Sequence, residues 1–262
     1  HRMIDKLNLK WGYKDTMTVT KRNLLRYVRS PQLIIFATIQ PIMFLFLFNY
    51  VFGGAIALPP GIDSYIIFLL PGIIVQTVLF GSTQAVIAMN ADVTGGLIDR
   101  FKALPMARSA VLSGRVLADT CRNAFVVFLM LVLGVLLGFV FSMGFWSSVA
   151  GIGMVMLFSF TMSWVGVTIG LVTKDAETAQ SAGFIWVFPF AFASSIFVPV
   201  ETMPSWLQNF AANQPVSLVA DSVRGLLVTG DTSDVGKALV WLFGIFAVFF
   251  FISVRQYSKT TK

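Results

Sequence analysis

Long stretches of apolar residues without charged side chains constrain this fold more than any other feature. The stretch 33–52 contains no charged residue at all, and about 20 such residues form a helix long enough to cross the ~30 Å hydrocarbon core of a bilayer. Only 12% of the residues are charged, about half the ~25% of soluble domains. Because a helix satisfies its own backbone hydrogen bonds in lipid, the sequence predicts an all-α polytopic membrane protein.

The apolar pattern predicts six transmembrane helices within a membrane domain that covers residues 32–254. The predicted spans are residues 33–52, 65–89, 116–141, 149–172, 179–197 and 235–254. Pro41, Pro71 and Pro189 lie inside spans, where proline predicts a kink. Residues 255–262 form a short basic tail.

The N-terminal residues 1–31 are polar and basic, in contrast to the spans. We expect an interfacial amphipathic helix over Asp15–Arg29, because apolar residues alternate there with basic ones at helical spacing. An ordinary solvated helix is the alternative. The basic residues of this helix are Lys21, Arg22, Arg26 and Arg29.

Two short amphipathic stretches lie between the fifth and sixth spans, at 204–212 and 216–228. Neither is long enough to cross a bilayer, so we expect both to rest at the outer interface or to insert partly. We expect both termini to be cytoplasmic. In that orientation every Lys and Arg of the chain except Arg224 and Lys237 lies on the cytoplasmic side, as the positive-inside rule requires.

The spans lack the groups that several function classes need. The single histidine is His1 and the single cysteine is Cys121, so we expect neither a catalytic site nor a metal site. No phosphate-binding loop of the G-x-x-x-x-G-K-[ST] type is present. Asp119 and Arg122 lie near the cytoplasmic end of the third span and are spaced to pair. An ion-coupled transporter usually has an ionisable side chain at mid-depth, and its absence here disfavours that class.

Three stretches together resemble one family: the segment 22–56, the loop 95–119 with GGLIDRFKALPMARSAVLSGRVLAD, and the segment 197–216 with FVPVETMPSWLQNFAANQPV. The chain resembles ABC type-2 transporter permeases, and most closely the permease subunit of daunorubicin/doxorubicin exporters. The resemblance implies a bacterial plasma-membrane permease that exports hydrophobic or amphiphilic compounds, either drugs or lipids. It also implies a second permease copy or paralogue and a separate cassette ATPase that binds ATP and Mg. Membrane lipids are expected partners and nucleic acid is not.

The resemblance places ATPase coupling in the loop between the second and third spans and in the interfacial helix. The candidate coupling residues are Asp99, Arg100, Phe101, Lys102 and Arg108. A solvated loop that only holds the topology through its basic residues is the alternative.

The substrate-pathway candidates are Gln76, Gln84, Phe184, Phe188 and Phe192. The three Phe residues are four apart and share a helix face, and aromatic surfaces suit apolar cargo. Ordinary helix packing or contact with lipid is the alternative for each. A membrane anchor or assembly subunit that transports nothing is the alternative for the whole chain.

Overall fold

The computed structural model describes the backbone of residues 2–103 and 108–259, and the side chains of residues 12–101, 103 and 109–259. Every regular element in these ranges is helical, which confirms the predicted all-α class. The elements are α1 (Arg2–Arg29), α2 (Pro31–Phe46), η1 (Leu47–Phe52), α3 (Tyr65–Thr94), α4 (Leu97–Lys102), α5 (Arg108–Leu136), α6 (Phe145–Val172), α7 (Ala176–Phe192), η2 (Val200–Thr202), α8 (Ser205–Asn213), α9 (Pro215–Arg224), η3 (Gly225–Thr229) and α10 (Val235–Lys259).

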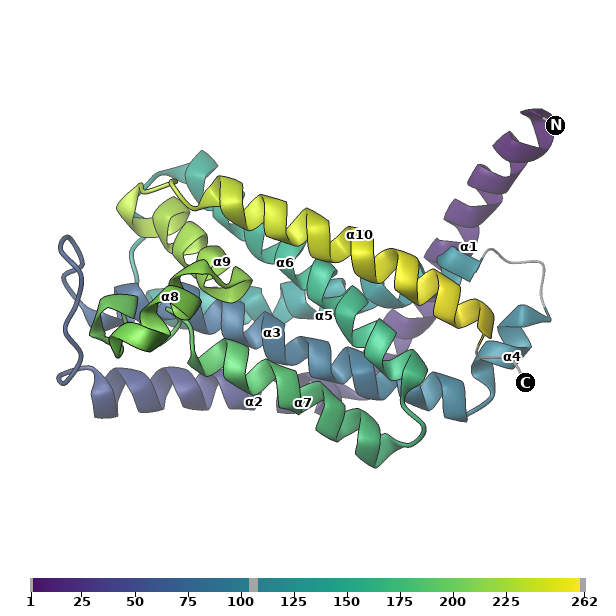
Figure 1. The fold of residues 1–262 in the computed structure, drawn as a ribbon, viewed down its shortest axis with the longest axis horizontal. Coiled ribbons are helices and arrows are strands. Elements are labelled where there is room, and N and C mark those ends of the chain that lie inside the picture. The colour runs from purple at the N-terminus through teal and green to yellow at the C-terminus, as the bar shows by residue number, and fades with distance from the viewer. Residues whose placement is uncertain (1, 104–107, 260–262) are drawn as a thin grey trace.

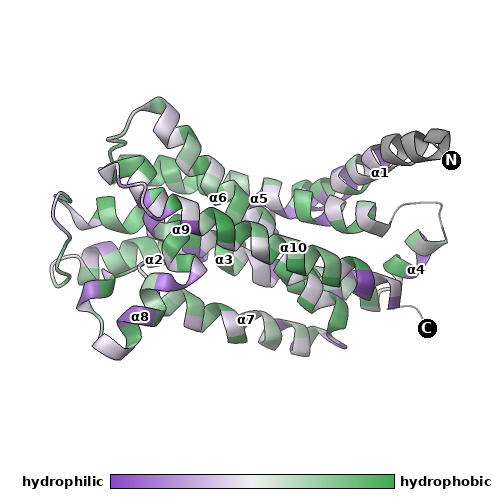
Figure 2. Cartoon of the chain, turned by 45° about the horizontal axis from the view of Figure 1, so that its top comes forward, coloured by the Kyte–Doolittle hydropathy of each residue, from purple (hydrophilic) through white to green (hydrophobic). Residues whose placement is uncertain are grey.

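The long helices form one bundle with two ends (Figure 1). α1, α4 and the C-terminal end of α10 lie at one end, which we call the basic end. The loop 53–64, α8 and α9 lie at the other, which we call the opposite end. Figure 2 shows hydrophobic residues along the long helices and hydrophilic residues on α1 and near the helix ends. This distribution is the one that a bilayer requires of a helical bundle.

Five helical segments in the described ranges are long and apolar enough to cross a membrane. They are Pro31–Phe52, Tyr65–Thr94, Ser109–Leu136, Phe145–Val172 and Val235–Lys259, and they correspond to the predicted spans one to four and six. α7 covers residues 179–192 of the predicted fifth span, which was expected to run to residue 197, and has only 17 residues. It lies beside α3 and runs from the basic end toward the opposite end (Figure 1). The six-span count stays a prediction.

The helix boundaries between the predicted spans 65–89 and 116–141 differ from the prediction. α3 continues to Thr94 and α5 already begins at Arg108. Asp92 and Arg115 are charged residues within these helices, and they form an ion pair with each other between α3 and α5. At its other end α5 stops at Leu136, five residues early, where Gly138 adopts a φ of 101° that favours glycine after a helix.

α3 is the central helix of the bundle. In its most apolar 18-residue window 89% of the residues are buried, against 17% for the first candidate span and 11% for α10. α6 crosses α3 closely because Gly166 and Gly170 face it. A Cβ on either glycine would come within 2.5 Å of a backbone carbonyl oxygen of α3, that of Ser82 or Val86. Small residues four apart let membrane helices approach in this way.

The two predicted short stretches form helices, as α8 and as α9 continued by η3. The predicted interfacial helix is part of a longer one, since α1 runs over 28 residues to Arg29. Pro31 is then the first residue of α2, a position where its missing N–H costs no hydrogen bond.

Candidate functional site

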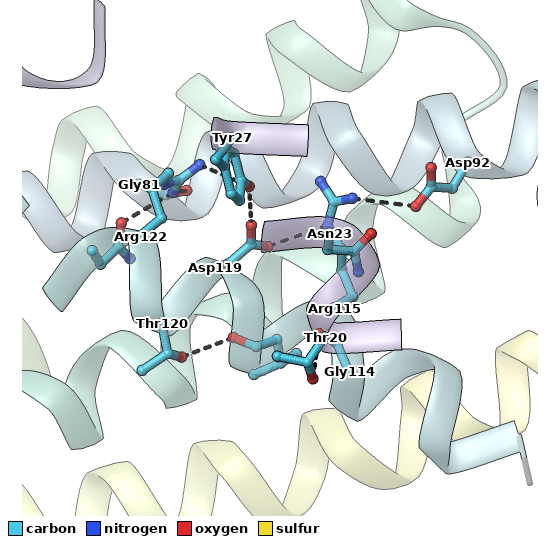
Figure 3. Close-up of polar contacts among 12 residues, drawn as sticks. Thr20, Asn23, Tyr27, Gly81, Asp92, Gly114, Arg115, Asp119, Thr120 and Arg122 are labelled. Atoms are coloured by element: carbon cyan, nitrogen blue, oxygen red, sulfur yellow. Dashed lines mark hydrogen bonds and ion pairs between the residues drawn. The ribbon is translucent and has the colours of Figure 1, made fainter. Parts of the chain in front are cut away.

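Asp119 is the centre of a buried polar network that joins α1, α3 and α5 (Figure 3). The hydroxyl of Tyr27 donates a 2.6 Å hydrogen bond to Asp119 Oδ1, and Asp119 is fully buried. Burial, followed by the negative charge of Asp119, raises the pKa of Tyr27 to about 12. The Tyr27 hydroxyl therefore keeps its proton at neutral pH and acts as a donor.

Arg115 connects two carboxylates. Its Nε lies 3.5 Å from Asp119 Oδ2, one helical turn further along α5, and its Nη1 lies 3.3 Å from Asp92 Oδ2 near the end of α3. The guanidinium is almost wholly buried. Buried charges need such partners, because an unpaired one loses its hydration without compensation. The ion pairs therefore hold α3 and α5 in register.

α1 packs on α5 through one face. Val19, Asn23 and Tyr27 recur every four residues along this face and are buried. Thr20 donates a 3.3 Å hydrogen bond to the carbonyl oxygen of Gly114. Gly114 permits the contact, since a Cβ there would lie 2.7 Å from the side chain of Val19.

The predicted basic residues of α1 mostly lie away from this face. Lys21, Arg26 and Arg29 are exposed. Arg22 is partly buried, and its guanidinium carbon lies 4.8 Å from the ring centroid of Phe101 on α4, within the range of a cation–π interaction. The structure therefore brings one predicted residue of α1 against one of α4.

Two other predicted coupling residues precede Phe101 on α4. Asp99 and Arg100 are exposed on α4, and Ile98 beside them is buried. The side chains of Lys102 and Arg108 lie outside the part of the chain that the structure describes.

The spacing of Asp119 and Arg122 predicted a direct pair, and this prediction is wrong. The Tyr27 hydroxyl lies between them: it donates to Asp119 and accepts a 3.4 Å hydrogen bond from Arg122 Nη1. The carboxylate pairs with Arg115 instead. Sequence reasoning missed Tyr27, Asp92 and Arg115. The spacing of Arg115 and Asp119, four residues apart on one helix, is a signal that could have found Arg115.

The pathway candidates separate into two groups. Gln76, Gln84 and Phe184 line one pocket of about 120 Å³. Phe188 and Phe192 lie outside it and are half-exposed. Their ring centroids are 5.8 Å apart and the rings are stacked. The Phe192 ring also stacks on the ring of Phe197.

A buried arginine also organises the opposite end. Arg224 of α9 donates hydrogen bonds to the carbonyl oxygens of Phe68 and Ser195 and to Asp221 at 2.6 Å. Its guanidinium also lies 3.8 Å from the Phe68 ring centroid. These contacts fix α9 against α3 beside a cleft of about 590 Å³. The positive-inside rule left Arg224 as one of two basic residues on the outer side. The structure shows that its side chain is buried and packs α9 against α3.

Comparison with known proteins identifies the family. Residues 14–228 match the family described as ABC-2 type transporter. The chain is 34% identical to "Daunorubicin resistance ABC transporter permease protein DrrB1" of Streptomyces coeruleorubidus over 92% of its own length and 85% of that protein. It is 30% identical to "Probable doxorubicin resistance ABC transporter permease protein DrrC" of Mycobacterium tuberculosis over 89% of its length and 84% of that protein. The chain therefore belongs to the ABC-2 type transporter family, as a multi-pass protein of the bacterial plasma membrane.

Proposed function

We propose that the chain is the permease subunit of an ATP-driven exporter that moves hydrophobic or amphiphilic compounds out of the cytoplasm or the inner leaflet. A separate cassette subunit binds ATP and Mg and hydrolyses the nucleotide. The names of the two relatives, which are permease proteins of drug-resistance ABC transporters, support this role. The cargo is either a drug of the anthracycline type or a lipid or glycolipid.

The topology that fits this role has six crossings and cytoplasmic termini. α7 supplies the extra crossing, since it runs between the two ends of the bundle beside α3. Nearly all Lys and Arg residues then face the cytoplasm at the basic end, in keeping with the positive-inside rule. In this topology α1 lies along the inner interface and α8 and α9 lie near the outer one.

One chain of contacts carries the coupling proposal. Phe101 of α4 packs under Arg22 of α1, and Tyr27 of the same helix binds Asp119 in α5. When the cassette subunit binds the exposed Asp99 and Arg100 and moves α4, these direct contacts transmit the movement through α1 to the transmembrane helix α5. Exposed side chains of both signs suit a polar protein interface.

Transport further requires a second permease, either another copy of this chain or a paralogue. The half-exposed Phe188 and Phe192 face of α7 gives cargo or the second permease an apolar surface. Aromatic side chains with few rotamers suit such a surface.

The test is co-expression with a candidate cassette ATPase, followed by purification through a tag on the permease only. ATP hydrolysis is then measured in lipid discs with anthracyclines, with native lipid extract and without either. Stoichiometric co-purification and cargo-stimulated hydrolysis are expected, and the better stimulant identifies the cargo class. A folded permease that retains no ATPase would contradict the proposal and favour the anchor alternative.

A further inference from the structure

The short helix α8 carries two exposed aromatic side chains at the opposite end of the bundle. Trp206 is 78% exposed and Phe210 is 46% exposed, and they lie one turn apart on the same side of the helix. Ala211, which is fully buried, holds the other side of α8 against the bundle. The aromatic pair therefore faces a partner outside the chain.

The neighbouring helix α9 differs from α8 in this respect. Every residue of α9 except Asp221 is buried, because α3, α6 and α10 all pack against this helix. Of the two short helices, α8 is thus the one that presents a surface to a partner.

The exposed surface of α8 changes from aromatic to polar across the helix. At about 3.6 residues per turn, Trp206 and Phe210 form one edge of this surface and Asn209 and Asn213 form its middle. Ser205 forms the other edge, and all five side chains are exposed. A helix that lies in a membrane interface meets such a gradient from hydrocarbon to water.

The aromatic edge lies on the side of α8 that faces α7. The ring centroid of Phe210 is 6.0 Å from that of Phe190, near the end of α7. From this point α7 extends along the bundle toward the basic end (Figure 1). The aromatic edge therefore points toward the hydrocarbon of a surrounding bilayer, and the polar edge points away from it.

Exposed aromatic residues also occur on other elements of the same end. Trp146 in the first turn of α6 is 80% exposed, and Tyr50 in η1 is 67% exposed. In Figure 1 the start of α6 lies at the top of this end, and η1, which continues α2, lies at the bottom. A single protein partner would cover one side of the bundle, whereas a bilayer surrounds it. Trp and Tyr concentrate at the level of the lipid head groups.

We propose that α8 lies in the head-group region of the outer leaflet, with Trp206 and Phe210 inserted toward the acyl chains. Since α8 contains no charged residue, it binds this region without regard to the charge of the lipid. The inference rests on the proposed topology, which places the opposite end at the outer side. It deepens that proposal by naming the residue pair that holds this end in the membrane.

The depth of α8 also affects α7. Gln214 follows α8 directly, and its Nε2 donates 2.9 Å hydrogen bonds to the carbonyl oxygens of Phe190 and Ala193 at the end of α7. A displacement of α8 in the leaflet therefore moves the end of α7.

Spin labels on the intact permease in lipid discs test the proposal. Cys121, the single cysteine, is replaced by serine, and one label is attached at Asn213→Cys or at Ala212→Cys, so that both aromatic residues stay in place. Oxygen collides with labels in the bilayer, and a water-soluble nickel complex collides with labels in water. We expect the label at 213 to lie at or below the phosphate level, within the ~5–10 Å that interfacial helices reach, and the label at 212 to lie in water.

Trp206→Ala should shift the label at 213 toward the water. Its exposed side chain makes the loss of the fold an unexpected outcome, and gel filtration verifies the fold. Trp146→Ala is the matched control, because it removes an equally exposed tryptophan from another element of the same end and should leave the depth at 213 unchanged. The depth should also be the same in discs of phosphatidylcholine alone and in discs that contain phosphatidylglycerol.

Four results would overturn the inference. They are a label at 213 as accessible to the nickel complex as one at the exposed loop residue Ser233, a label at 213 that neither reagent reaches because protein covers it, an equal shift in both tryptophan variants, and insertion that requires phosphatidylglycerol.

A membrane-impermeant maleimide on intact cells separates this inference from the proposed topology. Labelling of Ala212→Cys from outside, together with a water-exposed label at 213, would leave the topology standing and remove the inserted helix. Insertion at 213, together with labelling of Ala212→Cys only after lysis, would keep the inserted aromatic edge and overturn its place in the outer leaflet.

Discussion

The hydroxyl of Tyr27 donates a 2.6 Å hydrogen bond to Asp119, 92 positions further along the chain. This bond joins α1 to the interior of α5, where Asp119 also pairs with Arg115. Since Arg115 in turn contacts Asp92 of α3, a displacement of α1 acts on two transmembrane helices. The network is thus suited to transmit a movement from the basic end into the bundle.

Replacing Tyr27 by Phe should weaken that transmission. The variant leaves Asp119 Oδ1 without its donor and removes a partner of Arg122, so we expect a loss of about 1–3 kcal/mol in stability. Cargo stimulation of the partner ATPase should fall as well. Thermal unfolding and ATPase assays in lipid discs measure the two effects. Tyr13→Phe is the control, because Tyr13 lies on the same helix and is 68% exposed.

The buried pair of Asp119 and Arg115 should matter far more than a similar pair at the surface. Asp119→Ala leaves Arg115 with Asp92 alone, and breaking a buried pair costs about 3–5 kcal/mol. Asp234→Ala breaks the ion pair with Lys237, whose side chain is 65% exposed, and should change stability by less than about 1 kcal/mol. Unfolding in SDS followed by circular dichroism compares the two. Equal losses would show that the buried network contributes little.

The long helices could be predicted from the sequence because a bilayer demands a simple pattern. About 20 apolar residues are needed to cross, and α2 continued by η1, α3, α5, α6 and α10 all follow that rule. Their ends were harder to place. Asp92 and Arg115 look like loop residues in the sequence, yet each neutralises the other between α3 and α5 and stays helical.

Most contacts of the candidate site could not be predicted because they join residues far apart in the chain; the pair of Arg115 and Asp119, four residues apart on α5, is the exception. Sequence spacing favoured a pair between Asp119 and Arg122. It could not show that Tyr27 arrives from α1 and bridges them. Gln76 and Gln84 were suggested by their polarity alone, and only the structure shows that they line one pocket together with Phe184 and Arg122.

Gly114 should be required for the seating of α1. A Cβ there would lie 2.7 Å from Val19 and 2.9 Å from the carbonyl oxygen of Thr16, so Gly114→Ala must push α1 away from α5. Overpacking of this kind costs about 1–3 kcal/mol. We expect amide hydrogen exchange in residues 12–29 to quicken by about tenfold, which corresponds to ~1.4 kcal/mol.

Gly153→Ala in α6 is the matched control for Gly114→Ala. A Cβ at Gly153 meets nothing within 4 Å. This substitution should leave exchange in α1 unchanged and stabilise α6 by up to ~1 kcal/mol through helix propensity. Unaltered exchange in α1 of Gly114→Ala would contradict the packing argument.

The double variant Asp99→Ala with Arg100→Ala tests whether α4 is the point at which the cassette subunit acts. Both side chains are exposed, so their loss should change the stability of the permease by no more than about 0.5 kcal/mol. Phe101 still packs under Arg22, which keeps α4 against α1. A loss of cargo-stimulated ATP hydrolysis then reports on the interface and not on the fold.

The matched control is Lys174→Ala with Glu177→Ala. These residues are exposed charges of both signs beside the start of α7, at the same end of the bundle. If any pair of surface charges at the basic end sufficed for coupling, both double variants would lose cargo stimulation equally. We expect the α4 variant alone to lose it, with normal membrane insertion and normal basal hydrolysis in both. Full stimulation in the α4 variant would remove α4 from the coupling path and leave α1 as the remaining contact for the ATPase.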